Sequence, residues 1–195
     1  METITPIMAS SLNRGEYLRL KKAVEISTAD RHEKILDLGS MDGRLRTFLP
    51  EDCDYTGVDL YPKDKTILAH NLETGLLPQL MNSKFDVIFM NEFMEHVENF
   101  KSILLQCKEI LSDKGRIIIS TPSSNRFIIK EDPTHIHCFR KTNMENLAEI
   151  CGLKLTKTVG TYVHLPVLNI YIPTHQTVYS DVILYRLERT PPSGK

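Results

Sequence analysis

Two short apolar segments, each carrying an aspartate at or near its end, constrain the fold of this chain most. The segment KILDL at 34–38 contains Asp37 and runs into a turn that begins at Gly39. The segment YTGVD at 55–59 ends on Asp59. In open α/β proteins, the carboxyl ends of neighbouring parallel strands meet at the sheet edge where ligands bind. A glycine-bearing turn with an acid about 20 residues further on is typical of sites for nucleoside-containing cofactors, so we expect such a site here.

Strand-like and helix-like segments alternate along most of the chain. The block FDVIFMN at 85–91 is almost continuously apolar, which is typical of a strand buried in the centre of a parallel sheet. Strands are predicted at 34–38, 55–59, 66–69, 85–91 and 116–120, and helices at 14–27, 44–49 and 100–111. This alternation indicates a parallel sheet that is covered by helices on both faces.

The C-terminal part departs from this alternation. A capping box, Thr142-x-x-Glu145, is predicted to open a helix that Gly152 ends. Two further strands are predicted at 154–159 and 178–187, and the second follows no helix, so we expect it to be antiparallel. The expected fold is therefore α/β: a Rossmann-like, doubly wound, mostly parallel seven-stranded sheet with an antiparallel last strand and helices on both faces.

The length of 195 residues favours one domain, which we place at 1–190. The core motifs lie within 14–160, and the segment 160–177, rich in Pro, Tyr and His, is interpreted as an insertion. The segment 121–141 is predicted to be a long polar loop that carries histidines, and ordered loops of such length are usually functional. We expect the tail at 191–195 to be disordered.

Composition excludes several classes of protein. A hydrophobic content of 41% and a charged content of 25% are those of an ordinary soluble domain. The net charge of −1 provides no overall field that would attract nucleic acid. The four cysteines form no CxxC pair, which favours a reducing, cytoplasmic location. Because no apolar run approaches about 18 residues, we expect neither a membrane span nor a membrane partner.

Several motifs follow one another in a characteristic order. ILDLGSMDG matches the loop pattern D-x-G-x-G-x-G at Asp37, Gly39 and Gly43, with Met41 in place of the middle glycine. YTGVD supplies a second motif through Asp59. FDVIFMNEFMEHV, LSDKGRIIISTPSSN and a later HIHCF complete the series. Together these motifs resemble the class I S-adenosylmethionine-dependent methyltransferases, in particular the small branch with an E-x-x-E-H motif that is similar to methyltransferase type 11/23 proteins.

This resemblance implies S-adenosyl-L-methionine as the cofactor. The implied cofactor-binding residues are Asp37, Gly39, Ser40, Met41, Gly43, Asp59, Leu60, Asn71, Leu72 and Asn91. Asp59 would accept hydrogen bonds from the ribose hydroxyls, and Asn71 stands where the family has an acid near the adenine. Asp37 either contacts the cofactor or holds the loop, and Asn91 either lines the methionine end of the cofactor or is a strand-end turn residue. A nicotinamide-dependent oxidoreductase is disfavoured, because the G-x-G-x-x-G spacing that binds a pyrophosphate is absent.

Glu92, Glu95 and His96 follow the spacing i, i+3 and i+4, which puts the three side chains on one face if the segment is helical. Two carboxylates and an imidazole can bind a divalent cation. Some methyltransferases with this motif, among them the ubiquinone-pathway O-methyltransferases and the small-RNA 2′-O-methyltransferases, use it to bind a divalent cation. In the RNA enzymes, a later histidine completes the cation site. His135 is the positional candidate here. Alternatively, the motif orients the loop without a metal, and His96 or His135 acts as a general base or makes only structural hydrogen bonds.

The resemblance implies methyl transfer from S-adenosylmethionine to an oxygen, less readily a nitrogen, of a small or medium-sized acceptor molecule. One alternative is an inactive, cofactor-binding partner that regulates another methyltransferase. Another is a metal-assisted RNA 2′-O-methyltransferase. Basic residues near the expected active edge favour RNA, and the near-zero net charge disfavours it; these residues are Arg44, Arg46, Lys130, Arg140 and Lys141.

Overall fold

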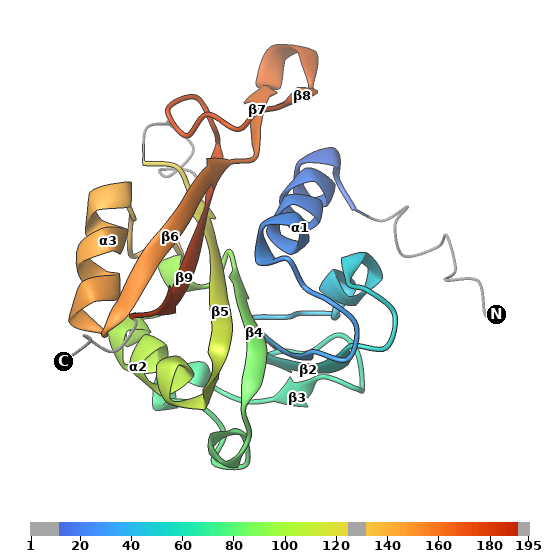
Figure 1. Ribbon diagram of the computed structural model, residues 1–195. Coiled ribbons are helices and arrows are strands. Elements are labelled where there is room, and N and C mark those ends of the chain that lie inside the picture. The colour runs from blue at the N-terminus through green and yellow to red at the C-terminus, as the bar shows by residue number, and fades with distance from the viewer. Residues whose placement is uncertain (1–11, 125–131, 191–195) are drawn as a thin grey trace.

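A computed structural model describes residues 12–124 and 132–190 of the chain (Figure 1). Its main sheet has seven strands in the order β3-β2-β1-β4-β5-β9-β6. The strands are β1 (Lys34–Leu38), β2 (Asp54–Asp59), β3 (Leu68–Ala69), β4 (Phe85–Asn91), β5 (Leu111–Pro122), β6 (Leu153–Gly160) and β9 (Val182–Arg189). Neighbouring strands pair in parallel from β3 to β5, whereas β9 is antiparallel to both β5 and β6. The predicted mostly parallel sheet with an antiparallel last strand is confirmed.

Helices cover both faces of this sheet, as predicted. Side chains alternate between the two faces along each strand, and the central strands present apolar side chains to both, so each face needs a covering layer. Ile35 on β1 belongs to the core beneath helix α1 (Arg14–Ser27), whereas Leu36 belongs to the core on the opposite face. That opposite core also includes buried residues of α2 (Phe100–Ile110) and α3 (Lys141–Ile150). Short 3-10 turns complete the described elements: Arg44–Phe48, Leu72–Thr74, Leu80–Asn82, Met94–His96 and Pro166–Leu168. No helix in the described ranges is both long and apolar enough to cross a bilayer.

Several predicted boundaries shift in the structure. The strand predicted at 66–69 is reduced to Leu68–Ala69, the one at 116–120 is part of the longer β5, and the last strand begins at Val182. The predicted capping box is wrong. Helix α3 begins one residue before Thr142, and its N-cap is Arg140, whose backbone N–H donates to Asn143 Oδ1 at 3.4 Å.

The segment predicted as an insertion forms a separate two-stranded antiparallel hairpin, β7 (Tyr162–Leu165) and β8 (Ile170–Pro173). Figure 1 shows this hairpin projecting beyond the sheet, beside the beginning of α1. Of the predicted loop at 121–141, the part at 125–131 lies outside the described residues, as does the tail at 191–195.

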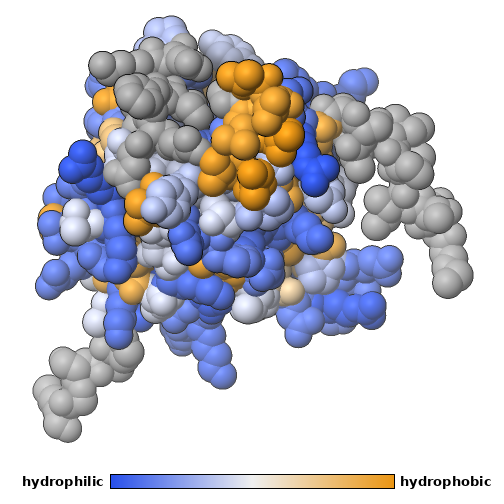
Figure 2. Space-filling view, turned by 90° about the horizontal axis from the view of Figure 1, so that it is seen from above, coloured by the Kyte–Doolittle hydropathy of each residue, from blue (hydrophilic) through white to orange (hydrophobic). Residues whose placement is uncertain are grey.

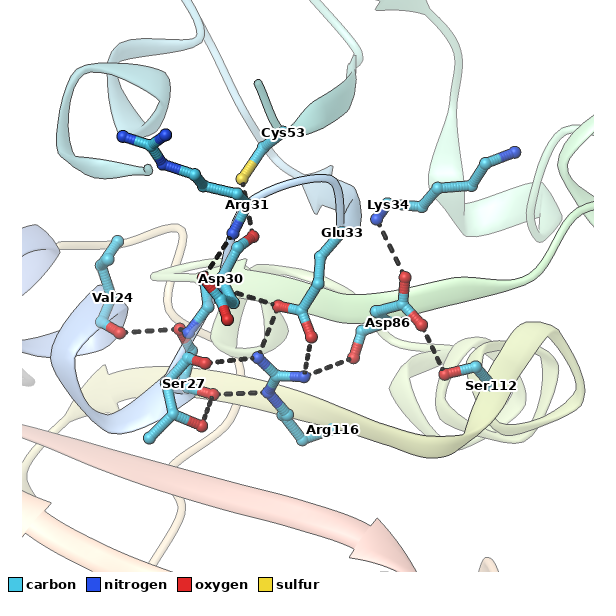
Figure 3. Close-up of polar contacts among 12 residues, drawn as sticks. Val24, Ser27, Asp30, Arg31, Glu33, Lys34, Cys53, Asp86, Ser112 and Arg116 are labelled. Carbon is cyan, nitrogen blue, oxygen red and sulfur yellow. Dashed lines mark hydrogen bonds and ion pairs between the residues drawn. The ribbon is translucent and has the colours of Figure 1, made fainter. Parts of the chain in front are cut away.

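A buried arginine fastens the C-terminal end of α1 to the sheet (Figure 3). Arg116 on β5 donates one hydrogen bond of 2.7 Å to each carboxylate oxygen of Glu33. The same guanidinium donates to the backbone carbonyls of Ser27 and Thr28, where the helix leaves carbonyl groups without intrahelical partners. Cations are also favourable at this end of a helix dipole. The helix is therefore held in place, with its N-terminal half at the carboxyl ends of β1 and β4.

Candidate functional site

Two adjoining cavities lie at the predicted sheet edge. The first cavity, of about 120 Å³, lies between α1 and the ends of β1 and β4; its lining includes the predicted residues Asp37, Gly39, Ser40, Met41 and Asn91, together with Glu92. The second cavity, of about 230 Å³, lies beyond β2; its lining includes the predicted residues Gly39, Asp59, Leu60, Asn71 and Leu72, together with His96. Gly39 lines both cavities, so the two cavities adjoin at this residue. Of the predicted cofactor-binding residues, only Gly43 lines neither cavity.

The turn after β1 depends on glycine at its start. Gly39 has φ +76°, and a Cβ at this position would lie 2.9 Å from the ring of Phe93. Met41 also adopts the left-handed region, with φ 51°, and its side chain is 41% exposed. The methionine that replaces the family glycine therefore keeps the glycine-like backbone and directs much of its bulk to solvent.

Asp59 holds this turn as well as lining the second cavity. Its Oδ2 accepts a 2.8 Å hydrogen bond from the backbone N–H of Met41, and its Oδ1 accepts one of 2.8 Å from Tyr61. Because a carboxylate offers about four lone-pair positions, each oxygen retains the capacity to accept a ribose hydroxyl. Asp59 therefore has a structural role that the sequence analysis did not assign to it.

Asp37 is buried, with 3% of its surface exposed, and lines the first cavity. The Tyr55 hydroxyl donates a 2.7 Å hydrogen bond to it from β2. Burial raises the pKa of Asp37 to about 7, although the bond from Tyr55 acts in the opposite direction. The carboxyl group thus changes its charge near neutral pH, beside a cavity that can hold a charged ligand.

The sequence analysis missed Arg19, which lines the first cavity. Its side chain is only 13% exposed, yet its contacts are long: 4.0 Å to a Glu16 carboxylate oxygen and 3.5 Å to Ser120 Oγ. Asn91 adds a buried side-chain amide whose oxygen and nitrogen have no hydrogen-bond partner among the described residues. Buried polar groups normally have partners, so these groups are available to hydrogen-bond a polar ligand in the first cavity. The sequence feature that could have identified Arg19 is its position next to the buried Leu20, at the margin of the apolar stripe of α1.

The E-x-x-E-H segment does not form the helical face that its spacing predicts. Only Met94–His96 forms a short 3-10 turn, and Glu92 lies before it with φ 49°. The Glu92 side chain accepts a 3.0 Å hydrogen bond from Ser120 Oγ and faces the first cavity. Glu92 therefore lies outside the group that Glu95 and His96 form, although its charge still acts on Glu95.

Glu95, His96 and His135 instead form a compact group whose potential ligand atoms lie within 4.8 Å of one another. The loop that carries His135 is tied to the turn, because the backbone N–H groups of Ile136 and His137 donate to the Glu95 carbonyl at 2.9 and 3.2 Å. The rings of His96 and His135 pack edge to face, with their centroids 4.7 Å apart. The predicted proximity of His135 to the motif is thus found in the structure.

Glu95 is the least exposed member of this group, at 1%. Neither of its carboxylate oxygens bonds to another described residue, and burial together with the Glu92 charge raises its pKa to about 9. One carboxylate and two imidazoles are a donor set that suits divalent transition metals. The residues present therefore fit a cation, which would satisfy the buried carboxylate.

Comparison with known proteins agrees with this geometry. Residues 12–158 match a family model described as a methyltransferase domain. The chain belongs to this family. The resemblance to methyltransferases of the type 11/23 kind is confirmed for this methyltransferase domain, and S-adenosyl-L-methionine is the cofactor that its family and fold neighbours imply.

The methyltransferase domain is similar to curated ubiquinone biosynthesis O-methyltransferases. The protein of Idiomarina loihiensis is 32% identical over 132 residues, which cover 57% of this chain and 54% of that protein. The protein of Photobacterium profundum is 29% identical over 127 residues, which cover 58% of this chain and 54% of that protein. The domain thus spans about half the length of these relatives.

Solved structures show the same fold. A SAM-dependent methyltransferase of Thermotoga maritima has a TM-score of 0.70 at 17% identity, covering 91% of this chain and 90% of that one. A SAM-dependent methyltransferase of Archaeoglobus fulgidus has a TM-score of 0.67 at 16% identity, covering 88% and 91%.

Proposed function

We propose that this methyltransferase domain transfers a methyl group from S-adenosyl-L-methionine to an oxygen, less readily a nitrogen, of a small or medium-sized acceptor. The observation that carries the proposal is the pair of cavities that adjoin at Gly39. One is largely apolar with hydrogen-bonding groups at its rim, and the other presents buried charged and amide groups. A nucleoside joined to a zwitterionic amino acid has this same division of chemistry.

The second cavity suits the adenosine part. Phe93 and Val97 provide apolar surface for a purine ring, and Asp59 lies where ribose hydroxyls would reach its remaining lone pairs. The Oδ1 atom of Asn71 accepts a 3.0 Å hydrogen bond from the backbone N–H of Glu73. Its amide nitrogen is therefore the group that would donate to the adenine edge.

The first cavity suits the amino-acid part. The Arg19 guanidinium would bind the carboxylate, because charge-assisted hydrogen bonds are about twice as strong as neutral ones. Asp37 and the Asn91 carbonyl oxygen would accept hydrogen bonds from the ammonium group. The charge of that ammonium would favour the ionised form of Asp37, whose pKa is otherwise raised to about 7.

When bound, the cofactor supplies an electrophilic methyl group for in-line displacement. The main task of the protein is then to align the acceptor oxygen with the methyl group and the sulfur atom. His96 lines the second cavity and lies 3.0 Å from Thr134 Oγ1 through its Nδ1, which restrains the ring. We assign His96 as the general base that removes the acceptor proton, with His135 beside it.

A metal-assisted reaction is the second candidate, and the cluster of Glu95, His96 and His135 is the observation that favours it. These three residues would hold a divalent cation, and a hydroxyl group bound to such a cation has a lowered pKa. Small-molecule hydroxyl and catechol acceptors suit both versions. The names of the O-methyltransferase relatives support oxygen as the atom methylated.

Calorimetry and turnover test the proposal together. We expect saturable binding of S-adenosylhomocysteine, no binding of NAD, and transfer of radioactive methyl from labelled cofactor to a phenol or catechol in an acceptor panel. Binding without turnover on phenols, amines and RNA would favour the inactive regulatory partner. Methylation of RNA alone would favour the RNA enzyme, and the absence of cofactor binding would refute the proposal.

A further inference from the structure

The β7–β8 hairpin has two chemically different faces. Its register pairs Tyr162 with Pro173, Val163 with Ile172, His164 with Tyr171, and Leu165 with Ile170. Because successive side chains of a strand point to opposite faces, the aromatic side chains share one face and the aliphatic side chains share the other.

The aromatic face is packed on helix α1. Gly15 of α1 is buried, and a Cβ there would lie 2.7 Å from Tyr171 Cε1 and 2.9 Å from Tyr162 Cζ. The Tyr171 ring also stacks on His164 with centroids 4.2 Å apart. A glycine at this position thus lets the hairpin contact the helix directly, next to Glu16 at the rim of the first cavity.

The aliphatic face is left largely in solvent, with Val163 half-buried. Leu165 is 36% exposed, Ile170 46% and Ile172 47%, and at the hairpin tip Val167 is 97% exposed and Leu168 64%. Figure 2 shows a continuous hydrophobic area on the side of the molecule from which the hairpin projects. Contiguous exposed apolar surface of this kind marks a docking site rather than ordinary surface.

The composition of the segment indicates what docks there. From 158 to 180 the sequence contains no Asp, Glu, Lys or Arg, although charged residues make up 25% of the whole chain. Protein interfaces surround their apolar centre with a polar rim and form about one hydrogen bond per 100–200 Å². Here Tyr162 and Tyr171 pack on α1 and His164 stacks on Tyr171, so the aliphatic face of the paired strands offers a protein partner few hydrogen-bonding groups.

We propose that the aliphatic face and tip of the hairpin dock on the surface of a phospholipid bilayer. A projecting tip with nearly fully exposed Val167 enters a fluid interface without needing a matching cavity, and interfacial elements bury their apolar side about 5–10 Å deep. Tyr179, 63% exposed, suits the headgroup level, where tyrosine is enriched. Arg14, exposed at the start of α1 beside Gly15, would attract anionic headgroups. Such peripheral contact requires no spanning helix, and it departs from the expectation of no membrane partner, which rested on the absence of a long apolar run.

Docking in this way would bring the first cavity close to the membrane surface, because the hairpin is seated on the helix that lines it. If the proposed function holds, the acceptor would then be an amphiphilic molecule presented by the bilayer. Vesicle binding itself does not depend on methyl transfer, so the two proposals fail separately.

The experiment is co-sedimentation of the full chain with phosphatidylcholine vesicles, with and without phosphatidylglycerol. We expect binding that increases with phosphatidylglycerol. In the double variant V167D/L168D, the affinity for vesicles should fall by about tenfold or more, because burying one valine or leucine side chain raises a binding constant by about one to two orders of magnitude. Ile150→Asp is the matched control, since Ile150 on α3 is also 63% exposed but lies outside the hairpin, and it should bind like the parent.

Circular dichroism and a thermal shift with S-adenosylhomocysteine verify that each variant is folded. Absence of binding to either vesicle, or equal loss of binding in the hairpin and control variants, would overturn the proposal. A parent dimer that becomes monomeric in V167D/L168D, measured by light scattering without lipid, would also overturn it, because a second copy would then cover the face.

Discussion

The hydroxyl of Tyr55 donates a 2.7 Å hydrogen bond to Asp37 from the neighbouring strand, beside the cavity proposed for the amino-acid part of the cofactor. Burial raises the pKa of the Asp37 carboxyl from 3.8 to about 7. Burial and the negative charge of Asp37 also raise the pKa of Tyr55, so the phenol remains a hydrogen-bond donor. Asp37 is therefore a buried group that titrates near neutral pH.

The free energy of unfolding should fall as the pH rises from 3.8 to about 7 through the contribution of Asp37. In this window the folded protein retains a proton that the unfolded chain has lost, so raising the pH favours unfolding. The contribution has an upper bound of about 4 kcal/mol, at 1.36 kcal/mol per pKa unit. Urea unfolding of the parent and Asp37→Asn across this range measures it. The variant should show a flatter profile, and identical profiles would contradict the assignment.

Arg19→Met should weaken binding of S-adenosylhomocysteine by about ten- to a hundredfold, as expected for loss of a hydrogen bond between charged groups. The same variant should bind 5′-methylthioadenosine as the parent does, because that ligand lacks the amino-acid part. Calorimetry with both ligands separates the two outcomes. Arg14→Met is the matched control on the same helix. Equal losses for the two ligands would show that Arg19 acts only through the structure of α1.

Asp59→Ala should weaken the binding of S-adenosylhomocysteine by at least about tenfold. The substitution removes the proposed hydrogen-bond acceptor for the ribose hydroxyls and the carboxylate that holds the turn at Met41. Calorimetric affinity equal to that of the parent would refute the ribose role. The melting temperature without ligand should also fall, since two backbone N–H groups lose a partner at 2.8 Å.

Met41→Gly should stabilise the protein by about 0.5–1 kcal/mol. A left-handed conformation costs an L-residue about 1–2 kcal/mol, and the greater flexibility of an unfolded glycine offsets about 0.5–1 kcal/mol of that gain. The Met41 side chain is 41% exposed, so little buried surface is lost. Denaturant unfolding provides the measurement. Destabilisation would show that the thioether packs more productively than its exposure indicates.

Glu95→Gln should lower affinity for Mn²⁺ or Zn²⁺ by about tenfold or more, because a neutral amide replaces the carboxylate of the cluster. Glu92→Gln is the control and should lower metal affinity less than Glu95→Gln does, since Glu92 bonds to Ser120 and acts on Glu95 only through its charge. Metal titration by calorimetry distinguishes the two variants. Equal effects would restore Glu92 to the metal set, and methyl transfer unaffected by chelators would remove the metal from the reaction.

The sequence alone determined the order of elements and the main chemical groups of the site. The apolar runs at 34–38 and 85–91 are a local property, because successive side chains of a central strand are buried on opposite faces of the sheet. Asp37 and Asp59 could be placed at one edge for the same reason, since parallel strands bring their carboxyl ends together. The capping box at Thr142 failed because the helix begins at Lys141, so that Asn143 takes the third helical position and accepts from the backbone N–H of the N-cap Arg140.

Tertiary structure decided what depends on contacts between distant segments. Glu92 has the spacing of a helical ligand, but its backbone adopts the left-handed region. Its side chain bonds to Ser120, 28 residues away, and so does not join Glu95 and His96. His135 reaches His96 only because its loop bonds to the carbonyl of Glu95. The aliphatic face of the hairpin stays exposed because Gly15, far away in the sequence, accepts the aromatic face. Local patterns specify elements and faces, whereas partners that lie dozens of residues apart are chosen by packing, which no short stretch of sequence contains.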